Sequence, residues 1–476
     1  MKKCQAVILA AGSGTRMKSA LPKVAHEILG KAMVNYVVDE VKKAGAKEVV
    51  VVVGYGREIV EGKIAGRGVT YALQEKQLGT GDAVRAAIRD IKKSDRDVLV
   101  LCGDAPLVRA DTLKKLVRLH RREKAAVTVL TGLLEDPSGY GRVIREPSGA
   151  IARIVEEKDA SAEERSINEI NSGSYVFSRK FLLENIESLV PENVQKEYLL
   201  TDLVYRAFFA GEKVSGYLVP DSDEIVGINS REELAFAAGV VTLRVAESLM
   251  RGGVTIEDPY NSYVGPDVKV GADTVIEPGV VIRGATRIGK NVRLGTGVYI
   301  EGSDIREAAE ILPYSVVIQA VVGKGARVGP FAHLRPESVL MEGARIGNFV
   351  EVKKSRIGKG SKANHLAYVG DSTVGAQVNI GAGTITCNYD GIAKHETVIG
   401  DGVFVGSDTQ LVAPVKIGRG AVIGAGATVT DDVPPFALAL SRAKQQNIAN
   451  WVIRKKPELI KKAGLEIPKR EKKKRG

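Results

Sequence analysis

Residues 276–300 read Ile-Glu-Pro-Gly-Val-Val-Ile-Arg-Gly-Ala-Thr-Arg-Ile-Gly-Lys-Asn-Val-Arg-Leu-Gly-Thr-Gly-Val-Tyr-Ile, with an aliphatic side chain at every sixth position. A period of six fits neither a helix nor an ordinary strand. It predicts a parallel β-helix, because each six-residue unit can form one short strand and one corner, and stacked coils bury the aliphatic side chains. The register continues at Val264, Val270, Ile276, Ile282, Ile288, Leu294 and Ile300, at Val322, Val328, Leu334, Leu340, Ile346 and Val352, at Ile357, Ala363 and Val369, at Val374, Ile380 and Thr386, and at Ile399, Val405, Leu411, Ile417, Ile423 and Val429.

The register is interrupted at residues 301–321 and again at residues 387–398. We expect both segments to leave the coils as loops. Because functional groups tend to lie on loops that a rigid scaffold positions, these interruptions are the places to look for chemistry.

The composition is that of a soluble protein of two or three domains, with 476 residues of which 44% are hydrophobic and 26% charged. No segment approaches the roughly 20 apolar residues that a membrane-spanning helix needs. Three widely spaced cysteines favour a reducing cytoplasm over a disulfide framework. The net charge of +12 is concentrated in residues 454–476, which hold eleven Lys or Arg and three Glu. We expect a cytoplasmic protein without membrane insertion and without a nucleic-acid partner, the basic tail being a solvated segment.

The first half of the chain alternates predicted strands and helices, which indicates a parallel α/β sheet. The predicted strands are 5–11, 48–53, 71–73 and 97–102, and the predicted helices are 28–41 and 81–92. Ligands bind at the carboxyl ends of such strands. The glycine-rich turn that begins at Gly12, and the pair Gly103-Asp104, both lie at strand ends.

Several strings in this half resemble the nucleoside-diphosphate-sugar pyrophosphorylases. They are Leu9-Ala-Ala-Gly-Ser-Gly-Thr-Arg-Met17 with Lys23, then Gln74, Gly79-Thr80, Gly103-Asp104-Ala-Pro-Leu, Gly139-Tyr-Gly-Arg-Val, Ile154-Val-Glu-Glu-Lys, Glu169-Ile-Asn-Ser-Gly and Val226-Gly-Ile-Asn229. Together with the six-residue repeats, the whole chain resembles the bacterial bifunctional N-acetylglucosamine-1-phosphate uridylyltransferases/glucosamine-1-phosphate N-acetyltransferases. The resemblance implies a Rossmann-like α/β nucleotidyltransferase domain followed by a left-handed hexapeptide β-helix.

Nucleotidyl transfer joins two anions, so it depends on positioning and on charge neutralisation. Arg16 and Lys23 would supply positive charge, and Asp104 could hold Mg²⁺. The resemblance implies that Asn229 is the second metal ligand and also contacts the nucleotide. It places UTP and UDP-N-acetylglucosamine on Leu9, Ala10, Ala11, Gly12, Lys23, Gln74, Gly79 and Thr80, with sugar contacts on Gly141, Glu156 and Asn171. Cys102 stands where many relatives are expected to have Tyr.

Ser230 and Glu233 form a predicted capping box, and the helix that follows reaches about Arg251. We expect it to be a spacer between the two activities; a core helix of the first domain is the alternative. The predicted domains are therefore 1–229 (uridylyltransferase), 230–252 (helical linker), 253–437 (β-helix acetyltransferase) and 438–476 (basic tail).

Attack on a thioester requires a neutral amine, and imidazole is the side chain best suited to take up the proton near neutral pH. Among the five histidines we assign this role to His365, in Asn364-His-Leu-Ala-Tyr368, with Asn388 as the residue that could orient it. Asn364 replaces an expected Gly. Arg335 and Lys353 would bind the phosphate of glucosamine-1-phosphate. The resemblance adds Tyr368 and Asn379 for the sugar, an acetyl-CoA site of Ala382, Asn388, Tyr389, Ser407, Ala425 and Arg442, and a homotrimer.

The sequence thus predicts two consecutive reactions. Acetyl-CoA and glucosamine-1-phosphate give N-acetylglucosamine-1-phosphate, which UTP and Mg²⁺ then convert to UDP-N-acetylglucosamine, a precursor of cell-envelope polymers such as peptidoglycan and lipopolysaccharide. One alternative is a single-activity nucleotidyltransferase whose β-helix only mediates oligomerisation. Another is a protein that binds nucleotide sugars without turnover.

Overall fold

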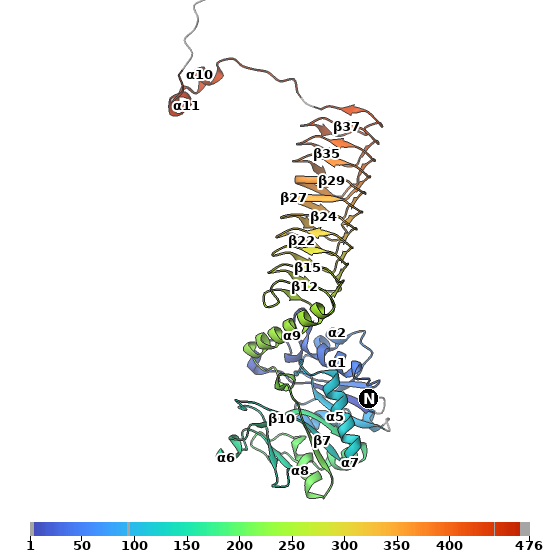
Figure 1. The fold of residues 1–476 in the computed structure, drawn as a ribbon, viewed down its shortest axis with the longest axis vertical. Coiled ribbons are helices and arrows are strands. Elements are labelled where there is room, and N and C mark those ends of the chain that lie inside the picture. The colour runs from blue at the N-terminus through green and yellow to red at the C-terminus, as the bar shows by residue number, and fades with distance from the viewer. Residues whose placement is uncertain (1–3, 93–95, 442, 467–476) are drawn as a thin grey trace, which may run out of the picture. The chain divides into compact units, whose positions relative to one another are not determined.

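The computed structural model describes residues 4–92, 96–441 and 443–466 (Figure 1). The chain forms two compact units, residues 1–343 and 344–476. In the described residues no helix has both the length and the apolar character needed to cross a bilayer.

The N-terminal part of the first unit is built on one sheet with helices on both faces (Figure 1). β1 (Cys4–Ala10) is an interior strand of this sheet, and it is apolar almost throughout because its side chains enter two separate cores. In spatial order the strands are β11 (Val214–Leu218), β7 (Val127–Leu133), β10 (Glu169–Phe177), β6 (Asp97–Cys102), β1 (Cys4–Ala10), β4 (Val49–Val53) and β5 (Thr70–Leu73). Core residues of α1 (Met33–Lys43), α2 (Arg57–Ile64) and α5 (Ala110–Glu123) cover one face, and those of α3 (Thr80–Ala86), α4 (Ile88–Lys92), α7 (Arg179–Asn185) and α8 (Thr201–Phe209) cover the other.

The sheet is mixed, which corrects the prediction of a parallel sheet. β5, β4, β1 and β6 are parallel, but β10 runs antiparallel to both β6 and β7. The chain reaches β10 through the antiparallel pair β8 (Arg142–Arg145) and β9 (Ile151–Val155), and not through a strand–helix–strand crossover. Antiparallel strands need no such crossover, so the alternation seen in residues 5–102 does not extend to this part.

Two predicted helices have different bounds in the structure. Residues 27–32 form a hairpin of β2 (Glu27–Ile28) and β3 (Lys31–Ala32), so α1 begins only at Met33. The turn requires positive φ at Leu29 and Gly30, which a helix could not accommodate. The helix predicted at 81–92 is divided into α3 and α4 at Ala87.

The helix α9 (Arg231–Arg251) begins with the predicted capping box, in which the Ser230 hydroxyl accepts from the Glu233 amide and the Glu233 carboxylate accepts from the Ser230 amide. Ala237 and Val241 are buried in a core cluster with Ile28 and Met33 of the N-terminal part. α9 is therefore also a core helix of the first domain, which was the alternative to a pure spacer.

From Thr255 to Leu340 the first unit forms β-helix coils with three strand faces. The first face has β12 (Thr255–Ile256), β15 (Val275–Ile276), β18 (Arg293–Leu294), β21 (Glu310–Ile311) and β24 (Arg327–Val328). The second has β13 (Tyr263–Val264), β16 (Val281–Arg283), β19 (Tyr299–Glu301), β22 (Val316–Ile318) and β25 (His333–Leu334). The third has β14 (Lys269–Val270), β17 (Arg287–Ile288), β20 (Asp304–Ile305), β23 (Val321–Val322) and β26 (Val339–Leu340).

The prediction that residues 301–321 leave the coils as a loop is wrong. β20, β21 and β22 lie in this segment and pair in register with the neighbouring coils. Val281 pairs with Tyr299 and Tyr299 pairs with Val316, so the second of these coils is shorter than the first by a single position. The corner between β19 and β20 has one residue fewer than the corresponding corner of the preceding coil, between β16 and β17. Gly302 in this corner has a φ of 57°, and Ile305 after it is still fully buried. Val316 pairs with His333 at the same reduced spacing, so the corner between β22 and β23 is shortened as well, and the interruption of the register consists of two shortened corners within the coils.

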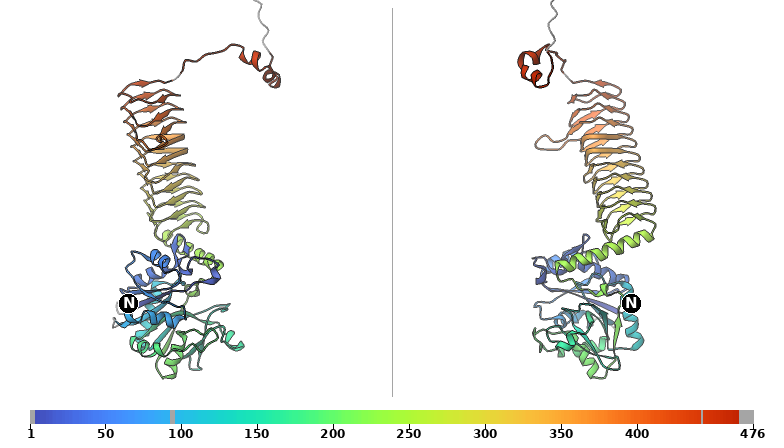
Figure 2. Two further views of the ribbon diagram at one scale, coloured as in Figure 1. Left: turned by 180° about the vertical axis from the view of Figure 1, so that it is seen from behind. Right: turned by 60° about the vertical axis from the view of Figure 1, so that its left-hand side comes forward.

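The second unit contains the remaining coils and a C-terminal segment. Its strands are β27 (Arg345–Lys353), β28 (Arg356–Ile357), β29 (Lys362–Gly370), β30 (Ser372–Val374), β31 (Asn379–Ile380), β32 (Ile385–Cys387), β33 (Thr397–Ile399), β34 (Phe404–Val405), β35 (Gln410–Val412), β36 (Val415–Ile417), β37 (Val422–Ile423), β38 (Thr428–Val429) and β39 (Leu438–Ala439), followed by α10 (Trp451–Lys455) and α11 (Pro457–Lys462). Cys387 pairs with Val412, which is much farther along the chain than Val316 is from its partner Tyr299. The coil that begins at Cys387 therefore contains extra residues, and the insertion predicted at 387–398 is confirmed. It projects from the coils of this unit (Figure 2).

A buried histidine in the first core should make stability depend on pH. His120 is 2% exposed, and its Nδ1 lies 2.9 Å from Oγ1 of Thr128. Burial lowers the pKa of His120 from 6.5 to about 4. Between pH 6.5 and pH 4, His120 is therefore protonated in the unfolded chain but neutral in the folded protein. The free energy of unfolding should fall by up to about 3 kcal/mol over this range. Urea unfolding at pH 7 and pH 5 should show a weaker pH dependence in His120→Gln; equal dependence in both proteins would contradict this.

Candidate functional sites

Three predicted residues meet at the carboxyl edge of the first sheet. Lys23 forms an ion pair with Asp104 through Oδ2, and its Nζ donates to Oδ1 of Asn229 at 2.9 Å. The Asn229 side-chain amide donates to the Gly227 carbonyl at 2.9 Å, which turns its oxygen toward Lys23. The Ile228 amide donates to the Asp104 carbonyl at 2.9 Å and ties the two segments together. A carboxylate oxygen and an amide oxygen therefore converge on one cation.

This donor set fits a divalent metal of the magnesium type. Mg²⁺ prefers one or two protein oxygens and completes its shell with water and phosphate oxygens. The ammonium of Lys23 stands at the position where Asp104 and Asn229 both offer oxygen, so the pair can face a cation without rearranging the backbone. The Asp104 side chain is 19% exposed, which leaves it open to ligands from solution.

The glycine-rich turn lies beside this cluster. Gly14 has a φ of 71°, and a Cβ there would collide with the side chain of Lys23, so the close approach of the turn to Lys23 requires glycine. The turn continues as the 3₁₀ helix η1 (Thr15–Met17), which presents the Arg16 side chain to solvent.

The residues predicted to bind the nucleobase line one cavity of about 200 Å³. Gln74, 5% exposed, is fixed there by hydrogen bonds from its Nε2 to Oδ2 of Asp82 at 2.7 Å and to the Gly79 carbonyl at 3.2 Å. Ala10 is buried and does not line the cavity. The lining consists of Leu9, Ala11, Gly12, Gln74, Gly79 and Thr80, as predicted, and of Gln77, Ala83 and Glu197, which sequence reasoning missed.

Residues 193–201 lie across one side of this cavity. A Cβ on Gly79 would come within 2.5 Å of the Tyr198 carbonyl oxygen, so the close approach of the two segments requires glycine. The Leu200 amide donates to Oγ1 of Thr80 at 3.1 Å, and the Gly81 amide donates to the Tyr198 carbonyl at 2.7 Å. These contacts fix the wall that holds Glu197.

The predicted sugar contacts also come together. The Asn171 amide donates to the Gly141 carbonyl at 2.8 Å, and a Cβ on Gly141 would lie 3.6 Å from Oε2 of Glu156. Burial raises the pKa of Glu156, and the neighbouring Asp159 adds to the effect. Glu156 lines a second cavity, of about 420 Å³, with Thr201 among its neighbours.

Cys102 faces this group of residues from the end of β6. Burial raises the pKa of its thiol to about 12, and the Asp104 carboxylate contributes to the rise. A Cβ on Gly173 of β10 would lie 2.8 Å from its Sγ, so the close approach of the thiol to this strand requires glycine there.

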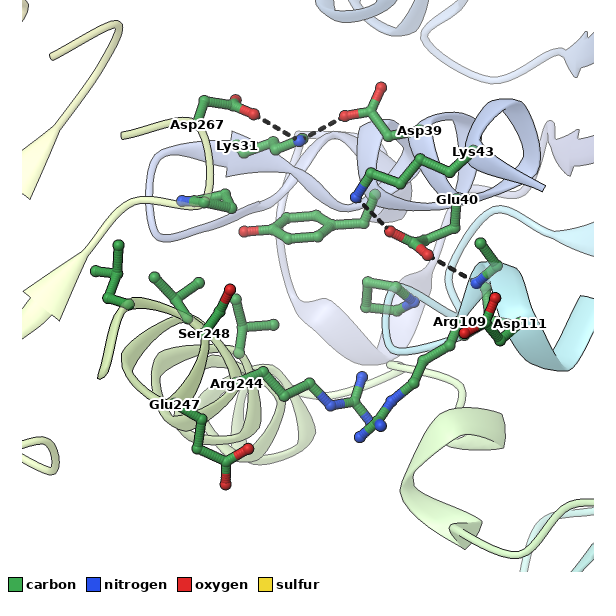
Figure 3. Close-up of a pocket in the computed structure, with 18 of the residues that line it drawn as sticks. Lys31, Asp39, Glu40, Lys43, Arg109, Asp111, Arg244, Glu247, Ser248 and Asp267 are labelled. Carbon is green, nitrogen blue, oxygen red and sulfur yellow. Dashed lines mark hydrogen bonds and ion pairs between the residues drawn. The ribbon is translucent and has the colours of Figure 1, made fainter. Parts of the chain in front are cut away.

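A larger cavity of about 700 Å³ in the first unit is lined, among the described residues, by none of the predicted site residues (Figure 3). Lys31 is paired with Asp39 at 2.5 Å and with Asp267 at 3.1 Å, and Lys43 with Glu40 at 2.6 Å. Arg109 and Arg244 share Asp221, at 3.0 and 3.3 Å. Because these cations are neutralised by the protein, we interpret the cavity as part of the packing between α1, α9 and the first coils.

In the second unit, His365 is exposed on β29 and opposite Asn348 of β27. Its Nδ1 lies 3.0 Å from Oδ1 of Asn348. The amide oxygen can only accept, so in the neutral imidazole this contact favours the tautomer with the proton on Nδ1 and the lone pair on Nε2. The expectation that Asn388 orients His365 is not met: its amide donates to the carboxylate of Asp371. Asn348 occupies the position of His365 one coil earlier.

Two lysines lie together near the predicted sugar residues. Lys394, on the inserted loop, has a lowered pKa because the charge of Lys353 lies close to it. Asp371 and Tyr368 are also near enough to act on the pKa of Lys394. A concentration of positive charge beside Tyr368 is suited to an anion. Arg335, the other predicted phosphate ligand, follows β25 in the first unit.

The predicted acetyl-CoA residues lie on successive coils of the second unit. The Asp408 amide donates to the Ala382 carbonyl at 2.7 Å, and the Gly426 amide donates to the Ser407 carbonyl at 2.9 Å. Ala382, Ser407 and Ala425 therefore form a column at one corner. Asn379 is half-buried on β31, and Tyr389 is 60% exposed on the inserted loop. Arg442 lies outside the described residues.

The α/β domain with its base-sized cavity and oxygen pair, followed by hexapeptide coils, defines a nucleotidyltransferase joined to a left-handed β-helix acyltransferase. Residues 5–223 match the nucleotidyl transferase family, residues 253–344 the GMPPB C-terminal domain and residues 396–431 the bacterial transferase hexapeptide family. The chain is 50% identical over 452 residues to "Bifunctional protein GlmU" of Trichlorobacter lovleyi (95% of this chain, 98% of the relative). It is 51% identical over 448 residues to the protein of that name from Carboxydothermus hydrogenoformans (94% and 100%). The chain belongs to the GlmU family and is a bifunctional acetyltransferase and uridylyltransferase.

Proposed function

We propose that the two activities are consecutive, that glucosamine-1-phosphate is acetylated in the second unit, and that the product is uridylylated in the first. The observation that carries the proposal is the convergence of Lys23, Asp104 and Asn229 beside a cavity of about 200 Å³, in a chain whose other unit presents an exposed His365 with Nδ1 against Asn348. The final product, UDP-N-acetylglucosamine, would be made in the cytoplasm for cell-envelope synthesis.

In uridylyl transfer, a phosphate oxygen of the sugar phosphate attacks the α-phosphorus of UTP, a P–O bond forms, and the bond to pyrophosphate breaks. Lys23 and Arg16 would neutralise the phosphates, and the cavity around Gln74 would hold the uracil. Asp104 and Asn229 would hold Mg²⁺, which when bound withdraws charge from phosphate oxygens. Gly141, Glu156 and Asn171 would orient the sugar hydroxyls and the acetamido group.

In acetyl transfer, His365 would accept a proton from the amine of glucosamine-1-phosphate at Nε2. The nitrogen lone pair then forms a bond with the thioester carbon, the C–S bond breaks, and the CoA thiolate takes up the second proton that the nitrogen loses as it becomes an amide. Lys353 would bind the sugar phosphate, and Tyr368 and Asn379 the sugar ring. Asn388, Tyr389, Arg442 and the column of Ala382, Ser407 and Ala425 would bind acetyl-CoA.

A homotrimer built on the β-helix is part of the proposal. It is supported by large apolar side chains at corners of the coils, including Tyr314 and Phe331, which stack at 5.3 Å and are 54% and 49% exposed. Phe349 and Leu366 are 57% and 64% exposed in the second unit. Contiguous exposed apolar surface marks interaction sites. Sedimentation equilibrium should give three times the mass of the chain.

The test is mass spectrometry of the products formed from glucosamine-1-phosphate, acetyl-CoA, UTP and Mg²⁺, with each component omitted in turn. We expect UDP-N-acetylglucosamine only in the complete mixture, and N-acetylglucosamine-1-phosphate to accumulate when UTP is left out. If no acetylated product forms while supplied N-acetylglucosamine-1-phosphate is still uridylylated, the proposed substrate and site for acetyl transfer are wrong.

A further inference from the structure

Arg142 is a charged side chain that the two reactions do not use directly. It begins β8 and is 1% exposed. Its Nη2 forms an ion pair with Oε2 of Glu157 at 2.8 Å, and Nε and Nη2 each donate to the Arg165 carbonyl at 3.3 Å. Its Nη1 donates to the Tyr140 carbonyl. One guanidinium therefore joins three separate segments of the chain.

Each of these segments leads directly to a proposed sugar contact. Tyr140 and Arg142 are the neighbours of Gly141, and Glu157 follows Glu156. Arg165 belongs to α6 (Ala162–Arg165), at the end of the excursion that returns the chain to β10, where Asn171 lies. The three sugar contacts come from different segments, so their spacing depends on whatever ties these segments together.

The guanidinium of Arg142 is chemically suited to hold these three segments in a fixed arrangement. A buried ion pair contributes little net stability, because desolvation offsets the attraction, so stability alone does not explain a guanidinium here. The planar fork of arginine can bind several oxygens in a fixed geometry, which the single ammonium of lysine cannot do. A displacement of about 1 Å at a binding group can lower a reaction rate about 100-fold.

We infer that Arg142 is a positioning residue that sets the geometry of the sugar-phosphate site of the uridylyltransferase without contributing to UTP binding. The inference rests on the proposed function. The cavity for the nucleobase is lined by other segments, around Leu9, Gln74 and Gly79, whereas the bonds of Arg142 described above go to Tyr140, Glu157 and Arg165.

The experiment measures KM for N-acetylglucosamine-1-phosphate, KM for UTP, and kcat in full-length Arg142→Lys. We expect KM for the sugar phosphate to rise about tenfold or more, with KM for UTP within twofold. Glu157→Gln, which keeps Arg142 but removes the paired carboxylate, should shift KM in the same direction. Arg122→Lys is the matched control, since Arg122 lies on α5 and pairs with Glu123 at the surface, and it should leave both KM values unchanged.

Near-UV circular dichroism and thermal unfolding of the same preparations report whether the N-terminal part has folded. Equal rises in both KM values, or unchanged KM values in Arg142→Lys and Glu157→Gln, would overturn the inference. If Arg142→Lys does not fold, Glu157→Gln decides alone by the same criterion. A wild-type protein that does not uridylylate N-acetylglucosamine-1-phosphate would instead refute the proposed function, so the two failures are distinguishable.

Discussion

Alanine in place of His365 should lower kcat for acetyl transfer by about 100- to 10,000-fold, the range expected when a general base is removed. Uridylyl transfer by the same protein should stay within about twofold, because the proposed uridylyltransferase residues lie in the other unit. The physical reason is that the contact between Nδ1 and Asn348 favours the tautomer of the neutral imidazole whose Nε2 lone pair can take up the amine proton. The measurement is release of CoA thiol at saturating glucosamine-1-phosphate.

The matched control is His395→Gln in the same unit. The Nε2 of His395 is engaged by the Asp390 carboxylate at 2.7 Å within the inserted loop itself, so only its Nδ1 could serve as a base. We expect this variant to lose tenfold at most, through disturbance of the inserted loop. A reversed ranking of the two variants would assign the base to His395 and would refute our interpretation of His365.

The second large effect is expected from Asp104→Asn. The substitution keeps the volume of the side chain but removes the charge that faces Lys23 and the better of two metal ligands. A loss of about 4 kcal/mol of transition-state stabilisation corresponds to about 1,000-fold in kcat. Pyrophosphate release, followed as a function of Mg²⁺ concentration, should show this loss together with a higher Mg²⁺ requirement, while acetyl transfer stays normal.

Asp111→Asn provides the comparison, because Asp111 is an exposed carboxylate at the start of α5 that pairs with Lys114. It should leave both activities unchanged. Retention of uridylyl transfer within tenfold in Asp104→Asn would show that the carboxylate is not a metal ligand, and loss of both activities would indicate misfolding.

The β-helix could be predicted from the sequence because its signal is local and repeated. Each aliphatic residue of the ladder is separated from the next by one strand and one corner, so no long-range information is needed. The wrong prediction for residues 301–321 arises because it rests on this strict six-residue period. The period cannot distinguish a slightly shortened corner from a loop, whereas the pairing of Tyr299 with Val316 shows that the coils continue.

The antiparallel strand β10 and the partner of His365 were harder to predict, since both depend on which segments become neighbours. Asn348 does not belong to a recognisable motif. It could have been found from the sequence only because it precedes His365 by one full coil of this part of the β-helix. Lys394 was missed because the inserted loop has no register from which its position relative to Lys353 could be inferred.

The coils also constrain how the length of this half can change in evolution. An insertion or deletion within a strand would turn every later side chain of that coil to the wrong side, whereas a whole coil could be gained or lost without disturbing its neighbours. Corners are different, since one is shortened near Gly302 and a long segment is added after Cys387. New binding loops can therefore be acquired at the corners of this fold while its ladder of aliphatic residues stays unchanged.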